Sequence, residues 1–392
     1  MTGKRRGHNE GSIYQRADGR FVGAVSLGMV NGKRKRRVVY GRTHDEVRRA
    51  IRRLQADLDR GIPVQTASAT VAAFLDRWLA WVKPNVRPKT YASYVCQTQT
   101  HLKPALGSYR LEKLSQHHVN QMMTAMQTQG LSVTSVTYAR NVLRAALNQA
   151  MKWDMVGRNV AALADPPAAV AYEPYAFSAS EAARLLTALR GDRLEALYAI
   201  ALAVGLRQGE LLGLRWRDVD IDAGTVTVRY QLQKVDGHPT FTEPKSKSGR
   251  RTIALPASVT ATVRQHRTRQ LEERMRAGGA WQAQWDLVFA TPTGSPMNDV
   301  TLRKHFRQVL ERTGLWQEAV DAGRRPPRFH DLRHSAASFL AARGVHPSVA
   351  KAILGHANIS TTLQVYTSVG ADTIRGATAL VDDLFVPAKE AK

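Results

Sequence analysis

The hydrophobic and polar positions near the start of the chain alternate, as they do in half-buried β-strands. The alternating stretches are separated by Asp18-Gly19 and Asn31-Gly32, two dipeptides that favour tight hairpin turns. We therefore predict three short strands, over residues 12–15, 21–27 and 37–40. Thr43 and Glu46 have the spacing of a helix N-cap and its capping-box partner, so a helix should follow the third strand.

From residue 66 to residue 160 the apolar positions recur with the period of a helix. One apolar face is formed by Val71, Phe74, Leu75, Trp78, Leu79 and Val82. The pattern resumes over residues 90–102 after two prolines, and Ser115 and Thr134 are predicted to cap two further helices. Four or five helices with short connections are typical of a compact bundle. We expect the Met and aromatic side chains of this region to fill its core.

A change of composition separates this helical region from the rest of the chain. Residues 161–176 are rich in Pro and Ala and show no period, which is typical of a linker, and Pro166-Pro167 should keep part of it extended. A length of 392 residues agrees with two or three domains of ordinary size. The predicted organisation is a small domain at 1–61, a helical domain at 66–160, a linker at 161–176, a large domain at 177–386 and a tail at 387–392.

The large domain mixes helices with a few strands. Ser178 and Glu181 give a second capping-box signal, and residues 194–204 read as an apolar helix. Residues 225–231 and 251–255 alternate, which indicates a hairpin or a three-stranded sheet inside a mostly helical domain. The fold class predicted for the whole chain is multidomain and mainly α with small β-sheets.

Composition adds a strong positive charge to this picture. The chain has 57 Lys and Arg against 32 Asp and Glu, a formal net charge of +25. Such a bias predicts a polyanionic partner, with nucleic acid ahead of an anionic membrane surface. The longest apolar run, residues 196–206, is too short to span a bilayer, so no membrane association is expected. Cys96 is the single cysteine, and the basic start lacks an apolar signal region, so we expect a cytoplasmic protein.

Part of the positive charge is concentrated near the first predicted hairpins. Residues 1–61 contain 16 Lys and Arg against 6 acidic residues, a difference of +10. A basic block beside the second turn is the first candidate for DNA contact, and its members are Lys33, Arg34, Lys35, Arg36 and Arg37. The alternative is a solvated charge run without a partner.

The residues that point to chemistry lie in three separate segments. The first is the run Gly205-Leu206-Arg207-Gln208-Gly209-Glu210-Leu211, and the second is a predicted turn that holds Lys245 and Lys247. The third segment holds His330, Arg333, His356 and Tyr366. His330 and Arg333 are three residues apart and share a helix face. His330 and His334 are spaced like zinc ligands, but the intervening Arg333 disfavours a metal dication, so we expect no metal.

In order and spacing these segments resemble the tyrosine site-specific recombinases, the phage-integrase family. The resemblance runs from Arg207 to Tyr366. It includes the run of residues 205–211, called here the Arg207 box, an H-x-x-R motif at His330 and Arg333, and Leu354-Gly355-His356. It implies a mixed α/β catalytic domain at residues 177–386, a helical core-binding domain and a basic N-terminal domain that binds arm-type DNA sites. It also implies that Glu210 is a buried support for Arg207.

The resemblance implies a role for each residue of the site. Tyr366 is the nucleophile, and Arg207 and Arg333 hold the non-bridging phosphate oxygens. His356 donates a hydrogen bond to the phosphate, and His330 helps to take the tyrosyl proton. Lys247 is the general acid, with Lys245 as the alternative. The product is a 3′-phosphotyrosyl link, formed without a cofactor. Further DNA contacts are expected from the same turn and the strand after it, at Lys245, Arg250 and Arg251.

The resemblance also implies partners and a place of action. These are double-stranded DNA attachment sites, a homotetramer on DNA, and accessory DNA-bending and excision proteins, at the nucleoid of a bacterial host. Two other hypotheses share the positive charge. A DNA-binding regulator or inactive relative would need no Tyr366, and a topoisomerase would use the same chemistry without partner sites.

Overall fold

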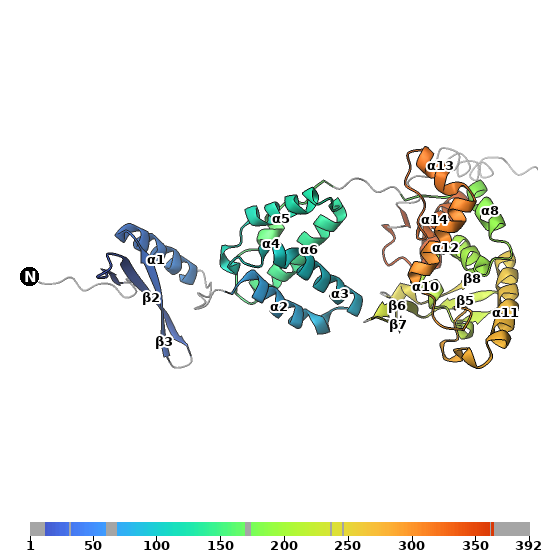
Figure 1. The fold of residues 1–392 in the computed structure, drawn as a ribbon, viewed down its shortest axis with the longest axis horizontal. Helices are drawn as coiled ribbons and strands as arrows, with labels where there is room; N and C mark the ends of the chain where they lie inside the picture. The colour runs from blue at the N-terminus through green and yellow to red at the C-terminus, as the bar shows by residue number, and fades with distance from the viewer. Residues whose placement is uncertain are drawn as a thin grey trace, which may run out of the picture. The chain divides into compact units, whose positions relative to one another are not determined.

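The computed structural model describes residues 12–30, 33–59, 69–168, 174–235, 237–244, 247–360 and 362–363 (Figure 1). The chain divides into two compact units, Met1–Ala171 and Tyr172–Lys392. Buried hydrophobic side chains of the described residues form three clusters: one in the N-terminal sheet, one in the helical bundle and one in the C-terminal unit. Within these residues, no helix combines the length and apolar character that a bilayer crossing requires.

The predicted N-terminal sheet and helix are confirmed. The strands are antiparallel in the order β1-β2-β3, with bounds β1 Ser12–Gln15, β2 Phe21–Val30 and β3 Lys33–Gly41. Helix α1 (His44–Asp59) packs on one face of the sheet through the buried side chains of Val47 and Ile51. Gly23 permits this approach, because a Cβ atom there would lie 2.5 Å from Ile51 Cδ1.

The predicted capping box at the start of α1 forms with one change. The Glu46 N–H donates to Thr43 Oγ1 at 3.2 Å, as a capping box requires. The Glu46 carboxylate, however, accepts a hydrogen bond from the N–H of Arg42 at 2.8 Å. The first bond satisfies a backbone donor that the first turn of the helix leaves free, and the second fixes the residue before the N-cap.

Residues 70–164 fold as the predicted helical bundle. Its elements are α2 (Val71–Val82), η1 (Lys83–Asn85), α3 (Pro88–Gln97), the π-helix η2 (Thr98–Leu102), α4 (Lys103–Leu106), η3 (Leu111–Lys113), α5 (Gln116–Thr128), α6 (Val133–Lys152) and α7 (Val160–Leu163). Ser115 caps α5, as predicted. The prediction that Thr134 caps the next helix is wrong, because the Ser132 hydroxyl accepts from the Ser135 N–H at 3.2 Å and starts α6 earlier.

Residues at both ends of the predicted linker pack against the units that they adjoin. Ala164 is buried in the bundle, where the Arg140 guanidinium of α6 donates to its carbonyl oxygen at 2.8 Å. On the other side, Tyr175 and Phe177 are buried in the C-terminal unit. The Phe177 N–H donates to the Ser335 hydroxyl of α14 at 2.8 Å, so this part of the segment is anchored beside the helix that carries Arg333.

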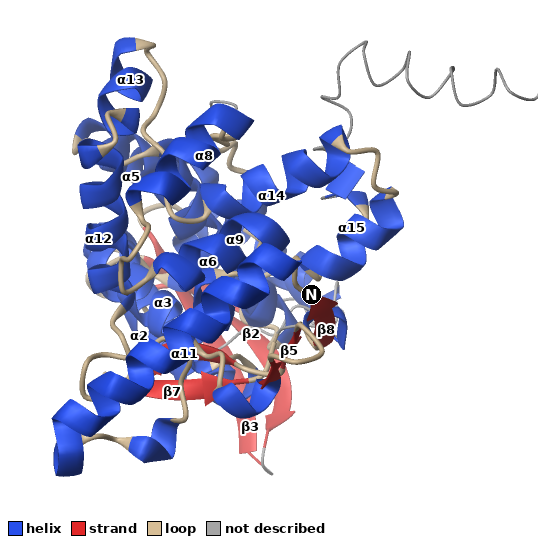
Figure 2. Ribbon diagram, turned by 90° about the vertical axis from the view of Figure 1, so that its right-hand side faces the viewer, coloured by secondary structure: helices blue, strands red, loops and turns tan. Residues whose placement is uncertain are grey.

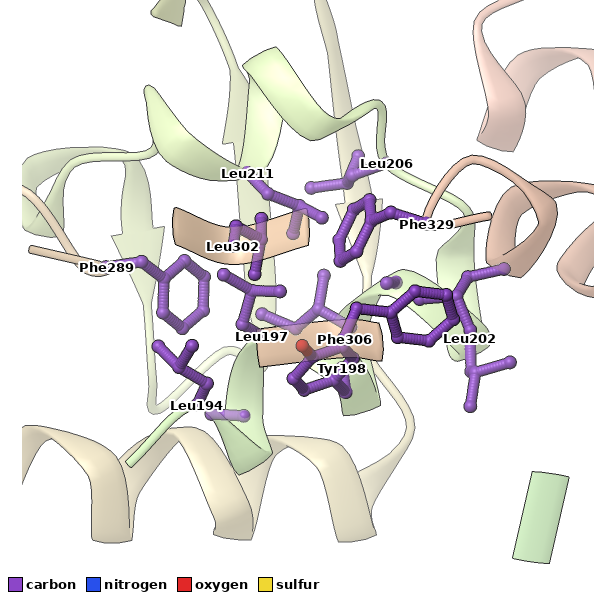
Figure 3. Close-up of a cluster of buried hydrophobic side chains, with 14 of the residues drawn as sticks. Leu194, Leu197, Tyr198, Leu202, Leu206, Leu211, Phe289, Leu302, Phe306 and Phe329 are labelled. Atoms are coloured by element: carbon purple, nitrogen blue, oxygen red, sulfur yellow. The ribbon is translucent and has the colours of Figure 1, made fainter. Parts of the chain in front are cut away.

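Helices dominate the C-terminal unit. They are α8 (Ala179–Ala188), α9 (Glu195–Val204), α10 (Gln208–Leu212), η4 (Trp216–Asp218), α11 (Ala257–Ala277), η6 (Gly278–Ala280), η7 (Ala283–Trp285), α12 (Asp299–Arg312), α13 (Leu315–Asp321), α14 (Asp331–Ala342) and α15 (Pro347–Leu354). The apolar helix α9 lies in the core, where Tyr198 stacks on Phe306 of α12 and contacts Phe329 (Figure 3). The long helix α11 runs diagonally across the view of Figure 2.

The strands of this unit form two small antiparallel ladders. Their bounds are β4 (Val219–Asp220), β5 (Thr225–Val228) and β8 (Arg251–Ala254) in one sheet, and β6 (Gln231–Val235) and β7 (His238–Thr242) in the other. The single strand predicted at 225–231 is wrong, because β5 ends at Val228 and the chain crosses to the second ladder at Gln231. The short helix η5 (Lys247–Gly249) then leads into β8.

Candidate active site

The loop between α9 and α10 places Arg207 at the N-cap of α10. Gly205 ends α9 in the left-handed conformation (φ +64°), and a Cβ atom there would lie 2.6 Å from Leu354 Cδ2. The Arg207 guanidinium donates to Glu210 Oε1 at 2.7 Å and to the Gly355 carbonyl oxygen at 3.0 Å. The Arg207 side chain is 38% exposed, so a ligand can reach it.

Glu210 is the buried anion of the site, with 2% of its side chain exposed. Its carboxylate also accepts from the Arg207 N–H at 3.0 Å and from Arg251 Nη2 at 3.1 Å. Burial by itself raises the pKa of this carboxyl, but the Arg251 and Arg207 cations and the hydrogen bonds outweigh burial and hold the pKa below its ordinary 4.5. Glu210 is therefore ionised at neutral pH and supports two arginines.

Arg333, in the first turn of α14, reaches the ends of two other helices. It is buried, and its guanidinium donates to the carbonyl oxygens of Gly205 and Leu354, both at 2.6 Å. These residues lie at the C-terminal ends of α9 and α15, where the backbone dipoles favour a cation. Burial, followed by the neighbouring Arg207 cation, lowers the pKa of Arg333 to about 9, so the side chain is still protonated at neutral pH.

His356 follows directly after α15, which Gly355 ends in the left-handed conformation (φ +67°). Its Nδ1 lies 2.9 Å from the hydroxyl of Thr362, a fully buried residue. Burial, then the cations of Arg333 and Arg207, lowers the pKa of His356 to about 4, so the ring is neutral at pH 7. A neutral ring whose Nδ1 accepts from Thr362 carries its proton on Nε2 and can donate it to an anion.

His330 is the N-cap of α14 and lies one turn before His334. The two rings are nearly perpendicular, with centroids 5.2 Å apart. Burial of part of the ring, then His334 and the Arg333 cation, lowers the pKa of His330 to about 4. The residue as a whole is exposed, so a neutral imidazole able to accept a proton lies at the surface of the site.

Arg251, which the sequence suggested as a DNA contact, points into this group. Its side chain is 7% exposed, and it donates to Glu210, to the Ile353 carbonyl oxygen at 2.7 Å and to the Gly249 carbonyl oxygen at 3.0 Å. Four of its five N–H donors are engaged inside the unit, and its DNA-binding role stays a prediction. The sequence held one signal for the inward direction: alternation along β8 places Arg251 on the same face as the buried Ile253.

Some predicted functional residues lie outside the described residues, or only their backbone is described. Lys245 and Tyr366 belong to the first group. The second group consists of Lys33, Arg34, Lys35, Arg37 and Lys247, which lie in β3 and η5. Arg36 is exposed, and Arg250 is 57% exposed and paired with Glu243 at 3.2 Å, so a DNA backbone can reach both side chains. Their DNA-binding roles stay predictions.

The described part of the site therefore carries an excess of positive charge. Three guanidinium groups, those of Arg207, Arg251 and Arg333, lie around the one Glu210 carboxylate. Backbone carbonyl oxygens orient these arginines. Because a carbonyl oxygen carries only a partial charge, these contacts do not neutralise the cations. A guanidinium has five N–H donors in a planar fork, which suits the oxygens of a phosphate. The arrangement can bind a phosphodiester and stabilise additional negative charge on it.

Comparison with protein families identifies the chain. A model described as the phage integrase family matches residues 176–372, which is half of the chain, and one described as the phage integrase N-terminal SAM-like domain matches residues 70–126. The chain belongs to the phage integrase family. Its C-terminal unit contains the catalytic domain of a tyrosine recombinase, and its helical bundle contains the SAM-like domain of these integrases.

Individual relatives agree along nearly the whole integrase. A protein named tyrosine recombinase XerC-like, from Caldanaerobacter subterraneus subsp. tengcongensis, is 28% identical over 91% of this chain and 94% of its own length. A protein named integrase, from Streptomyces ambofaciens, is 28% identical over 97% of this chain and 98% of its own length. The chain is thus an integrase or tyrosine recombinase of a phage or integrative element, and it binds DNA.

Solved structures agree with the fold of the integrase. The Tn1549 transposon integrase in complex with a circular intermediate DNA has a TM-score of 0.67 and 23% identity, over 80% of this chain and all of the other. A lambda integrase tetramer bound to a Holliday junction has a TM-score of 0.58 and 19% identity, over 94% of this chain and 99% of the other. The predicted mainly helical, multidomain fold is confirmed.

Proposed function

We propose that this integrase cuts and rejoins double-stranded DNA at specific sites through a 3′-phosphotyrosyl intermediate, both to integrate an element and to excise it. The observation that carries the proposal is the meeting of Arg207, Arg333 and His356 at the adjoining ends of α9 and α15, although they come from distant parts of the sequence. Two planar cations and one neutral imidazole in one place are what a phosphodiester in its pentacoordinate transition state needs.

In the proposed cleavage step, a bond forms between the Tyr366 phenolic oxygen and phosphorus, and the bond between phosphorus and the 5′ oxygen breaks. The tyrosyl proton passes to His330, and the Lys247 ammonium gives a proton to the departing 5′ oxygen, which leaves as a hydroxyl. Arg207 and Arg333 hold the non-bridging oxygens. The step needs help because a free tyrosine has a pKa of about 10 and is a weak nucleophile at neutral pH.

The protonation states of the two histidines support these roles. The pKa of His330 is about 4, so its ring is neutral at pH 7 and can accept the tyrosyl proton. The pKa of His356 is also about 4, and a neutral ring beside Thr362 can donate to a phosphate oxygen without adding a further cation to the site. Because the phosphotyrosyl link keeps the bond energy, attack by a second strand's 5′ hydroxyl can rejoin the DNA without ATP.

The same proposal assigns the parts of the chain. Residues 1–61 bind arm-type sites, residues 66–160 bind the core site, 161–176 link them to the catalytic domain at 177–386, and 387–392 form a tail. A lambda integrase with the same fold is described as a tetramer on a Holliday junction, and we propose that this integrase likewise works as a homotetramer on two attachment sites. It would act in the cytoplasm of a bacterial host, with accessory DNA-bending and excision proteins.

A nicked suicide substrate tests the chemistry. Its sequence is taken from the DNA that flanks the gene in its host, and the short 5′ fragment diffuses away after cleavage. The wild-type protein should form a covalent adduct in the presence of EDTA, and Tyr366→Phe should bind the same DNA without forming one. An equal yield of adduct from Tyr366→Phe would sink the assignment of the nucleophile.

Two alternatives predict different outcomes in the same assay. If the protein is a non-cleaving DNA-binding regulator, the wild-type chain will bind the substrate and leave it intact, as Tyr366→Phe does. A topoisomerase would form the adduct but would exchange no strands between two attachment sites. A recombination assay with two matched sites separates this case from an integrase.

A further inference from the structure

Arg251 is the first residue of β8 and follows the turn that carries Lys247. It directly follows Arg250, which is 57% exposed, whereas 7% of the Arg251 side chain is exposed. The difference follows from the strand, in which successive side chains point to opposite faces. Of two adjacent arginines in a basic turn, one is therefore available to DNA and the other is directed into the domain.

The Arg251 guanidinium connects three separate segments. Its Nη1 donates to the carbonyl oxygen of Gly249 at 3.0 Å, within the turn itself. Its Nε donates to the carbonyl oxygen of Ile353 at 2.7 Å, in the last turn of α15. Its Nη2 donates to Glu210 Oε2 at 3.1 Å, and that carboxylate also binds Arg207. One planar group thus joins the lysine turn, the helix that precedes His356 and the Arg207 box.

Two glycines allow close packing around Arg251, one against its guanidinium and one within the turn. A Cβ atom at Gly355 would lie 2.6 Å from Arg251 Nη1, so any other residue there would displace the guanidinium. A Cβ atom at Gly249 would lie 2.3 Å from Pro244 Cβ, so the turn also depends on glycine for its tight packing against Pro244. The Arg251 site is closed on one side by the end of α15 and on another by the turn.

We propose that Arg251 is a positioning residue that fixes the lysine turn against the arginines that grip the phosphate. The proposal rests on the proposed function, because it takes the general acid from this turn. Glu210 is the shared element: it orients Arg207 through one set of bonds and Arg251 through another. Arg251 also donates to the Gly249 carbonyl oxygen, so it holds the segment that begins at Lys247 in a fixed position relative to Glu210.

Two other roles for Arg251 are possible, and the contacts weigh against both. A phosphate contact needs free donors, whereas N–H···O bonds to Gly249, Ile353 and the two Glu210 oxygens occupy four of the five donors of this guanidinium. A purely structural ion pair is a weak source of stability, because the desolvation of two buried charges offsets their attraction. A role in aligning the turn explains all three sets of contacts, those to Gly249, Ile353 and Glu210.

The test separates protonation of the leaving group from every other step. One suicide substrate carries the ordinary 5′ oxygen at the scissile bond, and a second carries a bridging 5′ sulfur. A thiol has a pKa of about 8.5, so a thiolate leaves without a proton and cleavage no longer requires the general acid. Arg251→Met should slow adduct formation on the oxygen substrate by about 10²-fold, a typical contribution of general acid catalysis, and leave the sulfur substrate close to the wild-type rate. Lys247→Met should show the same split.

Control variants separate the positioning role from effects on DNA binding and on folding. Arg250→Met should weaken DNA binding and lower the yield on both substrates alike, because it removes an exposed cation. Arg276→Met, at a 73% exposed position on α11, should leave both rates unchanged. Arg251→Lys keeps a charge beside Glu210 but lacks the planar fork that reaches Gly249, Ile353 and Glu210 together, so it should fold and still show the split. Thermal unfolding of each full-length variant checks that it is folded.

The outcomes are distinct. Equal slowing of Arg251→Met and Arg251→Lys on both substrates, or wild-type rates on both, would overturn the positioning role. A loss of DNA affinity in Arg251→Lys without a split would show a phosphate contact instead. If the wild-type protein forms no adduct with either substrate, or Tyr366→Phe forms as much, the proposed function fails. A wild-type adduct combined with no split in the Arg251 variants refutes the present inference alone.

Discussion

Replacing Glu210 by Gln should destabilise the catalytic domain strongly at neutral pH. The carboxylate is 2% exposed and accepts hydrogen bonds from Arg207 and Arg251. Glutamine keeps the size of the side chain but removes the charge, so Arg251, itself 7% exposed, becomes an uncompensated buried cation near Arg333. Removing one partner of a buried ion pair typically costs about 3–5 kcal/mol. For a domain of this size, that loss corresponds to a fall in Tm of about 10 °C.

The loss should also depend on pH in one direction. The folded-state pKa of Glu210 lies below its ordinary value of 4.5, so the ionised carboxylate stabilises the fold above pH 4.5. That stabilisation disappears as the pH falls through the folded-state pKa, because the wild-type side chain is then neutral as well. The difference in unfolding free energy between the wild type and Glu210→Gln should therefore be constant near neutral pH and should narrow below pH 4.5.

Calorimetric unfolding of the full-length chain measures both effects. Glu311→Gln is the matched control, because Glu311 forms a surface pair with Arg307 at 2.8 Å and such exposed pairs contribute at most about 1 kcal/mol. Equal losses of stability in Glu210→Gln and Glu311→Gln at neutral pH would refute the reasoning. A difference between wild type and Glu210→Gln that does not change in acid would refute it too, because the charge of Glu210 would then not be the cause.

Three further predictions concern the reaction. Arg333→Lys keeps the charge but loses the planar fork that holds Gly205 O and Leu354 O, so single-turnover adduct formation should fall about 10²-fold or more, and an unchanged rate would contradict the assigned grip. Thr362→Val removes the hydroxyl that contacts His356 Nδ1, so adduct formation should slow about tenfold, and Thr362→Ser should restore the rate. A wild-type rate in Thr362→Val would show that the contact with Thr362 does not orient His356. The kcat/KM for cleavage should show no inflection near 6.5 on acidification, because the pKa values of His330 and His356 are both about 4 in the free protein; a loss of rate centred near 6.5 would mean that one of them titrates normally.

The fold could be predicted where local chemistry decides it. Ser178 and Glu181 form the predicted capping box, and the period of the apolar residues located α9. Predictions failed where two local solutions are equally good and tertiary packing selects one. Ser132 and Thr134 are both competent caps, and the small preference for Ser over Thr does not by itself decide where the helix starts. The strand predicted at 225–231 has suitable residues throughout, but pairing with different partners divides it between two ladders.

The site could be predicted only in part, for a related reason. Motif spacing singled out Arg207, Arg333 and His356 as candidates, because their side chains are distinctive. It could not identify what holds them, because the acceptors are backbone carbonyls, which every residue has. Thr362 gave no signal either, since a threonine six residues after a histidine is an ordinary feature of sequences. Arg251 was expected to contact DNA, and the strand period could have indicated that its side chain is directed into the domain.

Helix ends, more than carboxylates, hold the arginines, and this has a consequence for the protein without DNA. Arg207, Arg251 and Arg333 each donate to a carbonyl at the end of α9 or α15, whereas among the described residues the Glu210 carboxylate binds only Arg207 and Arg251 of the three. The free integrase therefore keeps cations close together whose mutual repulsion weakens its own fold. A bound phosphodiester relieves that repulsion, so DNA should raise the unfolding temperature of the catalytic domain, and an anion such as sulfate should do so in part. Among the described residues of the site positive charge exceeds negative charge, and a bound DNA backbone would balance it.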